Sequence, residues 1–304
     1  MLLKDCGKPA FSKSTISRLA HLGRAIDHGA SPLVFDDGFV GLNPPTESEV
    51  IYDAPSTYTR DRPATRSRKR RSTSSRSRPT GEAEPFSSAA IEAAYGTGFR
   101  LLVRHYKAIS YEDEKGLWVV IKTRPLGSDG PQAHFVIALP LRKEIWPKAW
   151  AFSVANGRRQ PFPLKHTNFP DASICAFTRE SKAWTPDDGI LPLADHYSLW
   201  AVKSWHRWLL GRWPGRQIGV GAHYRRQEFL PDEWCGCDSG KRYRDCHLAA
   251  DSLVSNDFAI NEFENLFHTP YATRTVPKSI LRAADTRWKV IPTLQEIYQP
   301  HSRR

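Results

Sequence analysis

The chain has few cysteines and no long apolar run. Only five of its 304 residues are cysteine, an odd number that does not suit a framework of paired disulfides. No apolar stretch reaches the roughly 18 residues of a membrane-spanning helix, and the N-terminus lacks the apolar core of a secretory signal. We therefore expect a protein of the reducing cytoplasm that does not enter a membrane.

The sequence also lacks the low hydrophobicity that is typical of a disordered chain. Hydrophobic residues make up 40% of the sequence and aromatic residues 11%, so most of the chain has the apolar surface that folding requires. The formal net charge is +12, and residues 58–80, with eight Arg, one Lys and one Asp, supply +8 of it. The remaining charge is ordinary for a soluble domain, so basicity does not by itself predict a nucleic-acid-binding fold.

Shifts in composition divide the chain into five parts. They are an N-terminal extension (1–57), a flexible basic linker (58–85), a folded domain (86–228), a cysteine- and histidine-containing segment (229–250) and a helical C-terminal tail (251–304). We expect one helix in the loosely packed extension at Lys13–Asp27, and two in the tail at Ser255–Phe267 and Pro277–Ala284. The linker is either a solvated spacer or, through residues 58–80, a nonspecific electrostatic contact to nucleic acid.

Apolar patterns within the folded domain predict an α+β fold. A short helix is expected at Ser87–Tyr95, and a long one at Leu193–Leu210, where apolar residues recur at helical spacing until Gly211. Between them lie four short runs rich in Val, Ile, Phe and Trp, which predict a four-stranded antiparallel meander. These runs are Phe99–Tyr106, Leu117–Lys122, His134–Leu139 and Ala149–Val154.

A long irregular segment, 161–189, follows the last of these runs and holds the residues best suited to chemistry. Its prolines exclude a helix, and long loops inside compact domains are usually functional. A thiolate such as that of Cys175 is a strong nucleophile, and an acyl group on sulfur stays activated for transfer to an amine. An amide such as that of Asn168 can donate to the oxyanion of that transfer, an effect of about 3 kcal/mol. His166 lies close by in the sequence, although a thiol that only fills space remains an alternative.

These residues carry a resemblance to a known family. The segments His166-Thr167-Asn168, Ser173-Ile174-Cys175 and Trp184-Thr185-Pro186 resemble the His-Pro-Asn, Ile-Cys-Leu and Trp-Ser-Pro landmarks of ubiquitin-conjugating enzymes. The run from Trp205 to His223 resembles the bacterial branch of that family, which accompanies antiphage operons of the CBASS type. The resemblance covers residues 86–225, and Thr167 and Ala176 depart from the family's proline and leucine.

The resemblance implies a UBC-like conjugating domain that acts as an acyl transferase. It makes Cys175 the thioester nucleophile, Asn168 the oxyanion-stabilising amide and His166 a structural residue of the loop, with Trp184 packed beneath. His223 is a further candidate for a place near Cys175. The implied partners are an activating enzyme, an amine acceptor, and a carried group that is either a ubiquitin-like protein or the C-terminus of a CD-NTase-like nucleotidyltransferase.

A second group of residues predicts a metal site. Cys235 and Cys237 are one residue apart, and Cys246 and His247 follow after an eight-residue loop. Three thiolates and one imidazole suit a closed, structural, tetrahedral Zn²⁺ site, and basic residues in the loop offset the thiolate charge. The spacing closely resembles the SEC-C zinc motif at the end of the bacterial preprotein-translocase motor, which usually serves as an adaptor for a protein partner.

Besides the active acyl carrier, the sequence leaves two other functions open. The second possibility is an inactive UBC-like scaffold that recruits a partner through its zinc motif. A zinc-containing protein that associates with nucleic acid through residues 58–80 is the third possibility. Substitution of Cys175 separates the first of these from the second, because a scaffold does not need the thiol.

Overall fold

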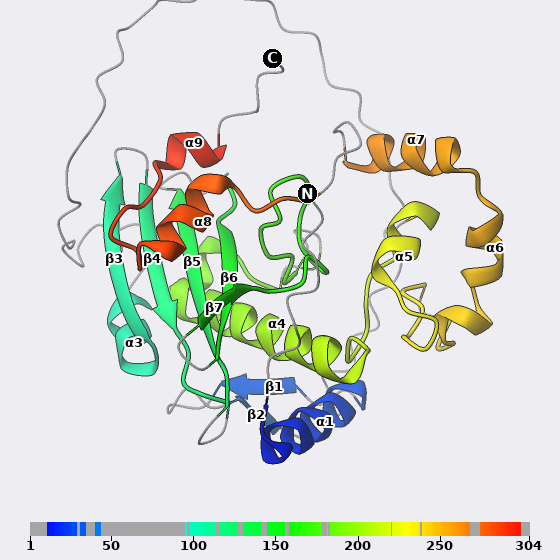
Figure 1. Cartoon of the computed structure of the whole chain (residues 1–304), viewed down its shortest axis with the longest axis horizontal. Helices are drawn as coiled ribbons and strands as arrows, with labels where there is room; N and C mark the ends of the chain where they lie inside the picture. Colours follow the sequence, from blue (N-terminus) through cyan, green and yellow to red (C-terminus); the bar gives the residue numbers. More distant parts are fainter. Residues whose placement is uncertain are drawn as a thin grey trace, which may run out of the picture.

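The computed structural model has an α+β architecture built on a five-stranded antiparallel sheet (Figure 1). It describes residues 11–28, 31–34, 40–43, 95, 98–113, 116–126, 130–140, 145–155, 158–177, 181, 183–219, 221–237, 239–267 and 274–298. The predicted linker, 58–85, lies outside these residues, as do Cys6 and all of the predicted helix Ser87–Tyr95 except Tyr95.

The five strands pair in chain order, so the sheet is an uninterrupted meander. Its strands are β3 (Lys107–Asp113), β4 (Gly116–Lys122), β5 (Gln132–Pro140), β6 (Lys148–Ala155) and β7 (Arg158–Pro161). In the central register, Val119 of β4 lies opposite Ile137 of β5. Two N-terminal strands, β1 (Ser31–Val34) and β2 (Val40–Asn43), form a separate antiparallel pair.

The prediction of a strand at Phe99–Tyr106 is wrong, because helix α3 (Gly98–His105) occupies that segment. Its apolar residues are nearly consecutive in the sequence, a pattern that is also typical of a buried strand. Leu102 is fully buried, whereas its neighbours Leu101 and Val103 are 40% and 45% exposed, and the short helix buries only one side. The meander therefore begins with β3. Strand β7 is an additional strand, which its polar sequence, Arg-Arg-Gln-Pro, does not predict.

The other predicted elements in this part of the chain are confirmed within a few residues. The remaining helices are α1 (Lys13–Asp27), α4 (Ile190–Leu210), α5 (Ala222–Glu228), α6 (Leu248–Leu253), α7 (Asn256–Phe267), α8 (Lys278–Asp285) and α9 (Leu294–Tyr298). Helix α4 ends at Gly211, whose φ of 80° is the left-handed conformation that glycine adopts readily. None of the helices described is both long enough and apolar enough to cross a bilayer.

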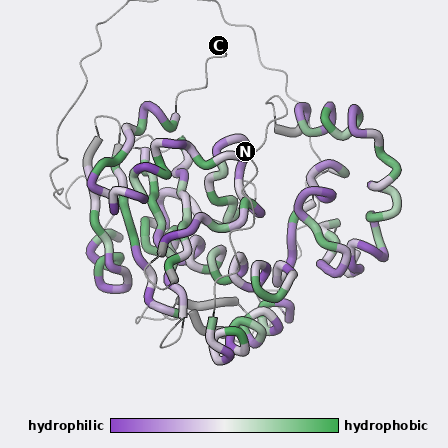
Figure 2. The backbone as a smooth tube through the Cα atoms, in the orientation of Figure 1, coloured by the Kyte–Doolittle hydropathy of each residue, from purple (hydrophilic) through white to green (hydrophobic). Residues whose placement is uncertain are grey.

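Helices cover both faces of the sheet (Figure 1). On β4, Leu117, Val119 and Ile121 belong to the main core shared with α4. Their neighbours Trp118 and Val120 face the other way and pack with α8 and α9 in a second core. Because both faces are buried, β4 and β5 are continuous hydrophobic runs rather than alternating ones (Figure 2).

Helix α1 also belongs to the main core, although the sequence suggests a loosely packed arm. Leu19 and Leu22 are buried in the core that contains α4. Gly23 lies against the ring of His206, and a Cβ atom at this position would come within 2.1 Å of the imidazole Nε2. Asp27 at the end of the helix accepts a 2.8 Å hydrogen bond from the Gly215 N–H, so α1 is attached directly to the segment after α4.

Candidate functional site

The irregular segment after β7 folds back on itself and brings the predicted site residues together. The Cys175 N–H donates to the His166 carbonyl at 3.0 Å, and the Asn168 N–H donates to the Ser173 carbonyl at 2.6 Å. These two hydrogen bonds close a hairpin-like loop without regular strands. Consequently His166, Asn168 and Cys175 share one end of the loop, as the sequence predicts they could.

Strand β6 fixes the other side of this loop. The Trp150 indole N–H donates to the Asp171 carbonyl at 2.8 Å, and the Lys148 ammonium pairs with the Asp171 carboxylate at 2.6 Å. The Ile174 N–H donates to the Ala149 carbonyl at 2.8 Å. The residue just before Cys175 is therefore tied to the sheet, and this limits the movement of the thiol.

His166 is a structural part of the loop. Its ring lies against Trp213 with 3.9 Å between centroids. Its backbone N–H donates to the Glu228 carboxylate at 3.0 Å, and its backbone carbonyl accepts the Trp200 indole N–H at 2.7 Å. Burial lowers the pKa of His166 to about 4, so the imidazole is neutral at pH 7. These contacts suit a residue that holds the loop in place.

The side-chain amide of Asn168 is engaged within the same loop. Its Nδ2 donates to the Ser173 hydroxyl at 3.2 Å and to the Ile174 carbonyl at 3.1 Å. An amide nitrogen has two hydrogens, so these two bonds use both of them. Asn168 lies beside Cys175 on the same cavity walls, and it can donate to an oxyanion there only by giving up one of these loop contacts.

Cys175 lies on a wall shared by two cavities. Their volumes are about 430 and 450 Å³, and the lining residues common to both are Asn168, Phe169, Cys175, Ala176 and Phe177. The first cavity also contains Lys203 from α4, and the second contains Trp146 and Tyr298. Cys175 is therefore half-buried and borders open space, rather than being enclosed by packed side chains.

The surroundings of Cys175 keep the free thiol protonated. The pKa of the Cys175 thiol is raised to about 11, mainly by burial and also by the Glu228 carboxylate, while Arg274 acts in the opposite direction. A pKa this high leaves only a very small fraction of the thiol as thiolate at neutral pH. A thioester carries no charge at sulfur, so the burial that disfavours the thiolate does not disfavour an acylated Cys175.

Trp184 supports the segment between Cys175 and α4, as the sequence predicts. It is fully buried, and its indole N–H donates to the Gly189 carbonyl at 2.8 Å. Its ring packs 6.0 Å from that of Phe177 and 5.7 Å from that of Trp146. A short 3₁₀ helix, Pro186–Asp188, then leads into α4.

Three other residues near the thiol are not evident from the sequence. Tyr224 lines the first cavity, and Glu228 and Arg274 act electrostatically on Cys175. Glu228 and Arg274 are far apart in the chain and belong to no motif, so no local signal reveals them. His223, which the sequence offers as a candidate, lines neither cavity and instead packs against α7.

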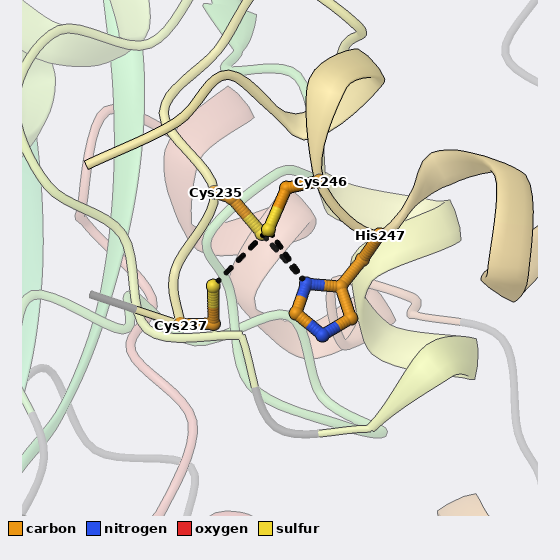
Figure 3. A group of neighbouring side chains, drawn as sticks. All are labelled: Cys235, Cys237, Cys246 and His247. Carbon is orange, nitrogen blue, oxygen red and sulfur yellow. Dashed lines mark hydrogen bonds between the residues drawn. The ribbon is translucent and has the colours of Figure 1, made fainter. Parts of the chain in front are cut away.

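The four predicted metal ligands lie together (Figure 3). Their ligand atoms are all within 4.8 Å of one another. Cys235 Sγ and Cys246 Sγ are each 3.2 Å from His247 Nδ1, and Cys237 Sγ is 3.4 Å from Cys246 Sγ. Ligands bonded to zinc at about 2.0 to 2.3 Å in a tetrahedron are roughly 3.5 to 3.8 Å apart, so a small adjustment suffices. The cluster is close enough to bind a metal ion.

A small core of its own supports the metal cluster. Tyr243 is buried, its ring packs edge-on against Phe229, and its hydroxyl donates to Asp251 at 2.9 Å. Arg225 of α5 donates to both oxygens of the same carboxylate at 2.6 and 2.7 Å. The cluster is thereby anchored between α5 and α6 (Figure 1).

A buried carboxylate joins the metal cluster to the thiol site. Glu233 accepts hydrogen bonds from the Trp213 N–H at 2.6 Å and from Arg207 Nε at 3.3 Å, while its own carbonyl accepts the Tyr243 N–H at 2.9 Å. Trp213 in turn stacks on His166. The two candidate sites are therefore parts of one packed structure.

Comparison with protein-family models, with curated proteins and with solved structures finds no match to this chain.

Proposed function

We propose that Cys175 is the acceptor thiol of a UBC-like acyl carrier, which receives a carboxyl group as a thioester and passes it to an amine. The observation that carries this proposal is the place of Cys175 between two cavities, at the end of a loop braced by His166 and Asn168. The order of α3, strands β3 to β6, the loop and α4 supports the proposal, because it is the order that the sequence resemblance implies for a UBC-like domain. Strand β7 is an addition to that pattern.

The proposed reaction has two steps. In the first, the Cys175 sulfur loses its proton and attacks the carbonyl of a thioester held on the activating enzyme, whose thiolate leaves. In the second, an amine attacks the new thioester, the carbon–sulfur bond breaks and the amine loses a proton as the amide forms. An activating enzyme is required because a free carboxylate does not acylate a thiol unaided.

The oxyanion of the second step lies beside the loop amide in this proposal. Asn168 is the donor on the wall that Cys175 shares, and it exchanges one of its loop bonds for the oxyanion. The bacterial-type landmarks favour, as the carried group, a ubiquitin-like protein or the C-terminus of a CD-NTase-like nucleotidyltransferase. A role in antiphage defence in the cytoplasm follows from the same resemblance.

We further propose that the metal bound by Cys235, Cys237, Cys246 and His247 is Zn²⁺. Three sulfur ligands and one nitrogen ligand suit this ion and fill its tetrahedral shell, so its contribution is structural. The similarity to the SEC-C motif favours a protein-binding adaptor at this end of the molecule. The reduced thiols that such a site needs fit a cytoplasmic protein.

A peptide whose C-terminal glycine is linked to a small thiol as a thioester tests the acyl-carrier proposal, because it supplies an acyl group that is already activated. With the full-length protein at pH 8, intact-mass measurement is expected to show one added peptide acyl group on Cys175, which dithiothreitol then removes. The Cys175→Ala variant is expected to lose this product completely. A Cys6→Ser variant keeps the thiol site and is expected to load like the native chain. Failure of Cys175 to load at a large excess of thioester contradicts the proposal and favours the inactive scaffold.

A further inference from the structure

The chain returns to the Cys175 loop just before α8. The Thr275 N–H donates to the Pro170 carbonyl at 2.9 Å, and Arg274 Nη1 donates to the Leu164 carbonyl at 3.0 Å. The Arg274 guanidinium also lies over the Phe169 ring, 4.0 Å from its centroid. Two consecutive residues of the C-terminal tail thus hold the loop at three points.

Arg274 also forms a buried ion pair with Glu228 at the end of α5. The two side chains are 6% and 0% exposed. Glu228 accepts the His166 N–H, and the His166 carbonyl accepts the Cys175 N–H, so a continuous set of contacts leads from Arg274 to the thiol. Burial raises the pKa of Glu228, but Arg274, Lys165 and the hydrogen bond from the His166 backbone N–H outweigh burial and hold that pKa below its usual value. The carboxylate is therefore ionised. Removal of Arg274 takes away its ion-pair partner and leaves Lys165 as another cation that acts on it, while removal of Glu228 leaves the guanidinium without its partner.

Several charged and titratable groups act on the Cys175 thiol or line the two cavities that it borders. They are Glu228 and Tyr224 from α5, Arg274 from the tail, His166 from the loop, Lys203 and His196 from α4 with Arg216 around the first cavity, and Lys148, Asp171, Tyr197 and Tyr298 around the second. The two members of the buried ion pair act on Cys175 with opposite signs. The pair therefore offers a way to separate electrostatic influence from packing.

We propose that Arg274 is a positioning residue of the Cys175 site, which holds the loop from outside and neutralises the buried Glu228 carboxylate that is hydrogen-bonded to that loop. Its role in acyl transfer rests on the proposed function, whereas its effect on the free thiol needs no partner. Because Arg274 follows α7, the reactivity of Cys175 depends on the return of the C-terminal tail to the loop.

The rate at which iodoacetamide alkylates Cys175, measured against pH in the full-length chain, tests this inference. In Arg274→Gln the Glu228 carboxylate loses its buried ion-pair partner, so alkylation at pH 9 is expected to slow about three- to tenfold. In Glu228→Gln the arginine charge is left uncompensated, so alkylation is expected to accelerate by a similar factor. Peptide mapping assigns the modification, and Arg274→Lys keeps the charge, so its profile is expected to stay within about twofold of the native one.

The alkylation rates of the two glutamine variants are expected to change in opposite directions, and this distinguishes a positioning role of Arg274 from simple loss of structure. Loosening of the loop would expose the thiol and speed alkylation in both glutamine variants alike. An equal acceleration in both, or unchanged profiles in both, overturns the inference. The peptide-thioester measurement fails or succeeds separately, because native Cys175 that does not load contradicts the proposed function while opposite alkylation shifts still support the placement of Arg274.

Discussion

Stripping the metal from the full-length protein with a strong chelator is expected to unfold residues 229–250 while the five-stranded sheet stays folded. The small core of this segment contains only Phe229, Cys235 and Tyr243 as buried members in the part of the chain described. Such a core is too small to fold alone, and binding of a structural zinc ion to a comparable site supplies about 10 kcal/mol or more. Hydrogen exchange is expected to rise sharply in this segment and little in β4 and β5.

Metal content and matched variants complete this prediction. Elemental analysis of the purified native chain is expected to give one zinc ion per molecule, and the Cys246→Ala variant is expected to retain almost none. Cys175→Ala removes a thiol outside the cluster and is expected to keep a full complement. A native chain that contains no metal, yet protects residues 229–250 from exchange, would show that the cluster is not a metal site.

Replacement of Asn168 by alanine is expected to slow transfer from loaded Cys175 to an amine by about a hundredfold, because the amide no longer stabilises the oxyanion. Loading itself is expected to change much less. The measurement is single-turnover discharge of the Cys175 thioester to free lysine. The lost loop bonds are expected to lower the free energy of unfolding by only about 1 to 2 kcal/mol.

A serine variant provides the control for loop damage. Ser173→Ala removes one of the two loop contacts of the Asn168 amide but leaves the amide in place. It is expected to discharge within a few-fold of the native rate. If Ser173→Ala slows discharge as much as Asn168→Ala does, the amide acts by holding the loop, and its role as an oxyanion donor is refuted.

Much of this fold can be predicted from the sequence, because many of its helices, strands and site residues are determined by neighbouring residues in the chain. Helix α4 has an apolar stripe and ends at a glycine in the left-handed conformation, and both features are visible in the sequence. The metal cluster is equally visible, because all its ligands lie in Cys235–His247 and are brought together by one short turn. The same holds for Asn168 and Cys175, which lie in a single loop.

Tertiary contacts decide the features that sequence reasoning misses. Helix α3 resembles a strand because its apolar residues are consecutive, and only its packing shows which of them is buried. The Arg274–Glu228 pair joins the tail to α5, and neither residue carries a local mark of its partner. Tyr224 reaches the first cavity only because α5 packs beside the Cys175 loop.

If the sulfur of Cys175 carries an acyl group, a Cys175→Lys variant is expected to trap that group. The variant is expressed together with the proteins encoded beside its gene and purified under denaturing, reducing conditions, with Cys175→Ala as the matched control. An amine at this position is expected to capture the carried carboxyl group as an amide that withstands reduction, and mass spectrometry of the junction peptide identifies the captured C-terminus. We expect one such adduct at position 175 of the lysine variant and none in the alanine variant. No adduct on the lysine variant, together with no reducible adduct on the native chain, would contradict the acyl-carrier proposal.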